Sequence, residues 1–196
     1  MPERFGFACF LSTPDVPSPA SVISAAVAAF PDRIGSPIEA MVLDVRSNRS
    51  ETQPWPTGET LLRRHPGPTE LLFAYFASLR SNSGRVCVSF GWTKVAARIT
   101  ISFEDMAIAD QEAEIQQACQ RLHRLGFASA MDTVVAAGGE IGFDGELEAA
   151  TQALATMLAP LSLAQWIACD AGILPQYHTY FGIICRAGST CVLRRG

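Results

Sequence analysis

Runs rich in β-branched and aromatic residues stand at both ends of this chain and in its middle, and they restrict its fold more than any other feature. They cover residues 5–11 and 177–193, and the clearest pair covers 85–90 and 95–103. Residues 91–94, between that pair, are typical of a hairpin turn. Because terminal strands need strand partners, the sequence predicts one sheet that contains the hairpin and both terminal regions.

Helical patterns separate these strands. In residues 69–80 the apolar side chains of Leu72, Phe73, Phe76 and Leu79 recur at helical spacing. Further helices are expected at 20–30, 110–125, 146–158 and 162–170, and further strands at 38–45 and 130–137. The pattern predicts an α+β fold: one domain over residues 1–196, with a mixed, mostly antiparallel sheet and helices packed on it.

One segment lacks a clear period. Residues 46–68 are polar and contain four prolines, with Trp55 between the first two. A loop of this length is uncommon inside a compact domain and is often functional. We therefore expect a long, proline-rich loop here.

Composition restricts the compartment. Hydrophobic residues make up 48% of the 196 residues, and charged ones 17%, which is typical of a folded protein. The apolar runs are all broken well short of the roughly 18 residues of a membrane span, and the short run at 5–11 does not resemble a secretory leader. The sequence predicts a cytoplasmic protein that does not contact a membrane.

The six cysteines are scattered through apolar segments, which favours reduced, buried thiols. Cys185 and Cys191 are the exception, because they flank a short turn and could face each other across a hairpin. A shift of one residue in register would instead give them different cross-strand partners.

Known cofactor motifs are missing. The chain has no glycine-rich phosphate loop, no H-E-x-x-H, no C-x-x-C and no G-x-S-x-G. Its three histidines, His65, His123 and His178, are far apart in sequence. We therefore expect no cofactor and no metal.

One enzymatic hypothesis survives. Cys169, Asp170 and His178 are close in sequence, and a Cys-His-Asp arrangement could form a hydrolase-like site there. The alternative interpretation of His178 is a hydrogen-bonded residue among aromatic neighbours at the start of a strand.

Charge is distributed unevenly. Residues 1–100 have ten basic and eight acidic side chains, whereas residues 101–196 have five and eleven. The acidic residues gather at 104–114 and 140–148. They could stabilise helix N-termini, or they could form an electronegative surface that attracts a basic partner. Without a basic stripe, nucleic-acid binding is not expected.

The sequence thus favours a non-catalytic module that binds a basic protein. Trp92, at the expected hairpin tip, and Trp55, in the expected loop, are the aromatic candidates for an interface. The proposed partner-binding residues are Trp92, Glu140, Asp144, Glu146, Glu148 and Trp55. Size, acidity and missing motifs are those of bacterial immunity proteins and other toxin-neutralising inhibitors, and an arginine-rich, lysine-poor composition suggests a GC-rich bacterial genome.

Overall fold

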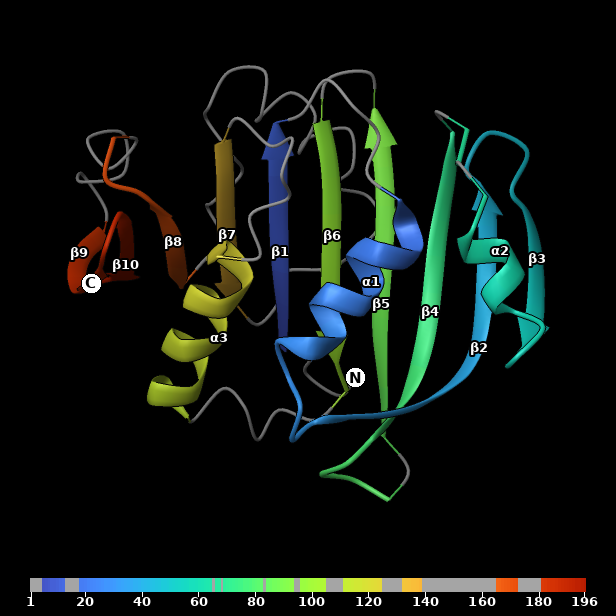
Figure 1. Ribbon diagram of the computed structural model, residues 1–196, viewed down its shortest axis with the longest axis horizontal. Helices are drawn as coiled ribbons and strands as arrows, with labels where there is room; N and C mark the ends of the chain where they lie inside the picture. Colours follow the sequence, from blue (N-terminus) through green and yellow to red (C-terminus); the bar gives the residue numbers. More distant parts are fainter. Residues whose placement is uncertain are drawn as a thin grey trace.

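The fold is an open, ten-stranded antiparallel sheet with helices over one face (Figure 1). The computed structural model describes residues 5–12, 18–64, 66–67, 69–82, 84–93, 96–104, 111–124, 132–138, 165–172 and 181–196. Its strands are β1 (Phe5–Ser12), β2 (Ile34–Asp44), β3 (Arg49–Pro54), β4 (Glu70–Ser78), β5 (Arg85–Thr93), β6 (Ala96–Phe103), β7 (Asp132–Gly138), β8 (Trp166–Asp170), β9 (Phe181–Ala187) and β10 (Thr190–Arg195). The helices in this part of the chain are α1 (Pro19–Ala28), α2 (Glu59–Leu62) and α3 (Glu112–Arg124).

The strand order is β3-β2-β4-β5-β6-β1-β7-β8-β10-β9. All nine pairings are antiparallel. The predicted antiparallel character of the sheet is therefore confirmed, and the fold is roughly α+β but dominated by the sheet, which is not mixed among the described strands. The predicted hairpin forms as β5 and β6, and the first and last strands belong to the same sheet.

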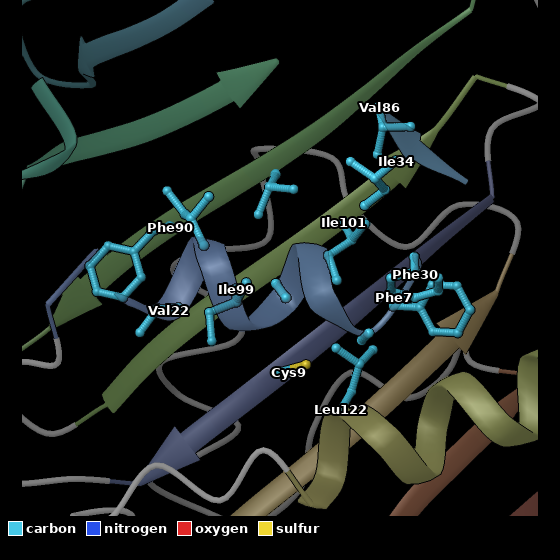
Figure 2. Close-up of a cluster of buried hydrophobic side chains, with 14 of the residues drawn as sticks. Phe7, Cys9, Val22, Phe30, Ile34, Val86, Phe90, Ile99, Ile101 and Leu122 are labelled. Carbon is cyan, nitrogen blue, oxygen red and sulfur yellow. The ribbon is translucent and has the colours of Figure 1, made fainter. Parts of the chain in front are cut away.

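The main hydrophobic cluster lies between the sheet and α1 and α3, which lie over the same face (Figure 1). In Figure 2, Val22 of α1 lies close to Phe90 and Ile99 of the sheet. The rings of Phe7 and Phe30 are in contact in a tilted arrangement, with ring centroids 5.0 Å apart. Burying such large side chains gives the central strands most of their stability.

Residues 69–80 form a strand, not the predicted helix. In β4, Leu71 and Phe73 are buried on one face of the sheet, and Leu72, Ala74 and Phe76 are buried on the other. A strand buried on both faces has a continuous apolar run, and such a run also satisfies helical spacing. The helix predicted at 162–170 is wrong for the same reason. The described part of that segment contains the strand β8, and its first four residues are all buried, so the apolar run does not alternate.

Residues 46–68 are not a structureless loop, because β3 and α2 lie within them. β3 is an edge strand that pairs only with β2 among the described strands. Most of its side chains are exposed, so it has no apolar alternation for the sequence to reveal.

Other predictions agree with the structure. α1 begins one residue before the helix predicted at 20–30, α3 lies within the helix predicted at 110–125, and β7 overlaps the strand predicted at 130–137. The C-terminal strand pair turns at Gly188, whose φ of +66° is one that glycine adopts readily. The helix predicted at 146–158 lies outside the described residues. No helix in the described part of the chain is both long and apolar enough to cross a membrane.

Candidate functional site

The two tryptophans predicted at an interface lie in different surroundings. Trp92 is 8% exposed and belongs to the main hydrophobic cluster. The prediction of an exposed hairpin tip was wrong because β5 extends to Thr93, and Trp92 pairs with Ala97 inside the ladder. Trp55 is half-buried against the cluster, and its backbone N–H donates to the carbonyl of Ile38 at 2.8 Å. Only Trp55 leaves aromatic surface for a partner.

The four acidic candidates, Glu140, Asp144, Glu146 and Glu148, lie outside the described residues. The described residues contain thirteen arginines and eleven carboxylates, although the whole chain has 15 basic and 19 acidic residues. Many described carboxylates are also paired: Glu39, Glu59, Glu70, Glu112 and Glu114 each form an ion pair with an arginine. The excess of negative charge therefore falls in the rest of the sequence.

Two residues of the enzymatic hypothesis, Cys169 and Asp170, belong to the end of the sheet formed by β8, β10 and β9, which we call the C-terminal unit. Cys169 and Asp170 are neighbours on β8, so their side chains point to opposite faces. Cys169 is fully buried, and burial raises the pKa of its thiol to about 12. A thiol in this state is protonated at neutral pH and is a poor nucleophile. His178 lies outside the described residues.

Asp170 instead approaches a histidine that the sequence analysis did not select. One carboxylate oxygen, Oδ2, lies 3.7 Å from Nε2 of His123 in the last turn of α3. On the other side of the ring, Nδ1 lies 3.0 Å from Oγ1 of Thr190 on β10. The signal for His123 was present, because it follows Cys119 by four residues and so lies on the apolar stripe of α3.

This Thr190–His123–Asp170 cluster has the residue types of a hydrolytic triad, but its geometry is that of a structural contact. Thr190 and His123 are 3% and 7% exposed, so the hydroxyl is not available to a substrate. The Thr190 hydroxyl can donate to Nδ1, which leaves Nε2–H directed toward the Asp170 carboxylate. The cluster therefore holds the end of α3 against β8 and β10.

α3 is also tied to the turn between α1 and β2. Arg33, in the turn before β2, is buried, and its Nε and Nη2 donate to the two carboxylate oxygens of Glu114, with Nη2 at 2.7 Å from Oε2. The hydrogen bond from Arg33 is the main cause that lowers the pKa of Glu114. Arg121 also donates to the carbonyl of Ala29 at 3.2 Å. α3 thus joins the α1–β2 turn to the C-terminal unit.

The C-terminal unit also differs from the sequence expectation for its cysteines. In the β9–β10 register, Cys191 pairs with Arg186, and Cys185 pairs with Val192. Cys185 faces α3, where Gln120 Nε2 lies 3.2 Å from its sulfur, whereas Cys191 lies on the opposite face. The disulfide considered between them does not form, and both thiols are free. Across β8 and β10, however, Cys191 directly faces Cys169.

Within the described ranges, no group of three or more His, Cys, Asp or Glu side chains could hold a metal ion.

Trp166 and Phe181 lie under arginine side chains. The guanidinium carbons of Arg194 and Arg195 are 5.2 and 5.1 Å from the respective ring centroids. These contacts are cation–π interactions at the edge of the sheet.

Comparison with known proteins gives few matches. No family model matches the chain, and no curated protein matches it. Among solved structures, the chain is similar to the Pseudomonas aeruginosa T6SS protein PA0821, with a TM-score of 0.43 and 8% sequence identity. That alignment covers 98% of this chain and 66% of the other chain.

Proposed function

We propose that this protein is a non-catalytic binding module that holds a basic partner protein through carboxylates of its second half. The observation that carries the proposal is the distribution of negative charge. The described residues contain more arginines than carboxylates, so the net negative charge of the chain belongs to the rest of the sequence. Among the described carboxylates, Glu39, Glu70 and Glu114 pair with arginines, whereas the sequence contains no basic residue within 105–110 or 140–148. Such a concentration of one charge accelerates association with a partner of opposite charge.

The burial and orientation of Cys169 support a binding function over a catalytic one. The hydrolase hypothesis needs a thiolate beside a histidine and a carboxylate. Cys169 is buried, points away from Asp170 and has a raised pKa. Asp170 lies beside His123, in a contact that packs α3 against the sheet.

The finer form of the proposal is an immunity-type inhibitor, a cytoplasmic protein that neutralises a toxin by covering it. The small size and net acidity of the chain support it, and its six free cysteines fit a reducing compartment. Trp55 is the aromatic residue that we propose at the rim of the interface, because it is half-buried beside the exposed edge strand β3.

The test begins with a pull-down from the native organism and then measures rates for the captured partner at two salt concentrations. Glu146→Lys with Glu148→Lys should slow association on the order of tenfold and flatten its salt dependence. The control is Asp32→Lys with Ala28→Lys, which makes a charge change of similar size at exposed positions away from Trp55 and should leave the rates near those of the wild type.

Trp55→Ala should chiefly raise the dissociation rate. Equal effects of the two charge reversals, or no effect of either, would contradict the proposal. It would also fail if an unbiased substrate screen found turnover that His178→Ala abolishes. Trp92→Ala does not test binding, because it removes a core side chain.

A further inference from the structure

Two buried thiols face each other across neighbouring strands of the C-terminal unit. Cys169 on β8 and Cys191 on β10 are direct cross-strand partners. Both are buried, 0% and 1% exposed, and both are free thiols. Because partners in a ladder share a face, the two sulfurs lie on the same side of the sheet, away from α3.

The hydrogen-bond pattern fixes the kind of pair they form. At one end of the β8–β10 ladder, the backbone N–H of Ala171 donates to the carbonyl of Ser189 at 2.9 Å. At the other end, the backbone N–H of Arg195 donates to the carbonyl of Gln165 at 2.9 Å. Hydrogen-bonded pairs recur at every second residue of an antiparallel ladder. The register between these ends has no shift, so Cys169 and Cys191 are a hydrogen-bonded pair.

We propose that Cys169 and Cys191 form a reversible disulfide across β8 and β10 when the protein meets a small-molecule disulfide. In a hydrogen-bonded pair the Cα atoms are ~5.5 Å apart, which is within reach of a disulfide. The Cβ–Cβ distance of such a pair, however, lies at the upper end of about 4.5–5.5 Å. A disulfide needs a Cβ–Cβ distance of about 3.5–4.5 Å. The strands must draw together, so the bond is strained and readily reduced.

The reaction is two steps of thiol–disulfide exchange. One cysteine thiol loses its proton and attacks oxidised glutathione, which forms a mixed disulfide and releases one reduced glutathione. The second cysteine then displaces the other glutathione, so that two cysteines are oxidised and one glutathione disulfide is reduced to two thiols.

Access for the oxidant requires the C-terminal unit to open. This unit is joined to the rest of the sheet only by the β7–β8 ladder among the described pairings, with three register pairs. The β1–β6 and β5–β6 ladders each have eight. Short ladders at the end of a sheet open locally before the protein unfolds.

The experiment equilibrates the full-length protein with mixtures of oxidised and reduced glutathione, both in the native state and during refolding, and then alkylates free thiols in denaturant. Trypsin leaves Cys169 and Cys185 on one peptide, because no Lys or Arg lies between Arg124 and Arg186. Chymotrypsin is therefore used as well, since Tyr177, Tyr180 and Phe181 separate the two cysteines. The expected product links Cys169 to Cys191, has lost two hydrogen atoms and reopens in excess reduced glutathione.

Matched variants check the assignment. Cys185→Ser should keep the cross-link to Cys191, and Cys169→Ser should lose it. The proposal is overturned if Cys169 and Cys191 remain fully alkylated at every ratio. It is also overturned if Cys191 pairs with Cys185, or if the bond persists in excess reduced glutathione. The wild-type map after digestion with both enzymes gives the answer even if a variant fails to fold, because trypsin separates Cys185 from Cys191 at Arg186 and chymotrypsin separates Cys169 from Cys185.

Discussion

The seven strands from β3 to β7 and the C-terminal unit belong to one sheet, but they are fixed in it to different degrees. The central strands pair over long registers beneath α1, and Phe7 of β1 contacts Phe103 of β6 edge to face. The C-terminal unit joins β7 through three register pairs and is held to α3 by the buried Thr190–His123 contact. From this difference we expect the C-terminal unit to open separately from the rest of the continuous sheet.

The largest effect is expected from removing aromatic side chains on the two sides. Phe7→Ala takes a fully buried ring from the core and should lower the free energy of unfolding by about 3–5 kcal/mol. Phe181→Ala, on the edge strand β9 beneath Arg195, should cost about 1–2 kcal/mol, because its neighbours can relax. Urea titrations of both variants measure the difference, and equal losses would mean that the two parts are equally fixed.

The next effect concerns the tie between α3 and the α1–β2 turn. Arg33→Met leaves the partly buried carboxylate of Glu114 without its main donor and should cost about 1–3 kcal/mol, less than the loss for a fully buried pair. Thermal and urea unfolding test this, with Arg63→Met as the control on an exposed pair. A loss of stability no larger than that of the control would show that the Arg33–Glu114 pair stabilises the fold no more than an exposed ion pair does.

Little of the Thr190–His123–Asp170 cluster could be predicted from the sequence, although several elements of the fold could. Period and turn chemistry identified α1, α3, the β5–β6 hairpin and the C-terminal strand pair, because each has one exposed face or a distinct turn. They failed at β4 and β8, where burial on both faces removes the alternation. The partners of Asp170 could not be predicted, since His123 and Thr190 come from distant elements that only tertiary packing brings together.

A smaller effect is expected at the other end of α3. Thr190→Val keeps the shape of the side chain and removes the hydroxyl at 3.0 Å from His123, so it should cost about 1 kcal/mol. Thr52→Val, at an exposed position of β3, should have almost no effect. The loss at Thr190 should appear as faster hydrogen exchange in β8 and β10 and not in β5 or β6, and a uniform change would contradict it.

The smallest effect is a pH dependence. The hydrogen bond from Arg33 lowers the folded-state pKa of Glu114, so the stabilisation is fully present above the ordinary glutamate pKa of about 4.3. It is lost as the pH falls through the lowered folded-state value. The stability advantage of the wild type over Glu114→Gln should therefore shrink in acid, and urea titrations between neutral pH and pH ~3 measure it. An advantage that grows in acid would reverse the assigned direction.

Native-state hydrogen exchange tests the central claim most directly, namely that the C-terminal unit opens without the rest of the sheet. Amides of Cys169 and Val192 should exchange at least about tenfold faster than those of Val88 and Ile101, with a weaker dependence on low urea concentrations. That result would show the local opening that oxidation of the Cys169–Cys191 pair requires. Equal exchange rates and equal urea dependence in both parts would show that the sheet opens only as a whole, and would contradict the account.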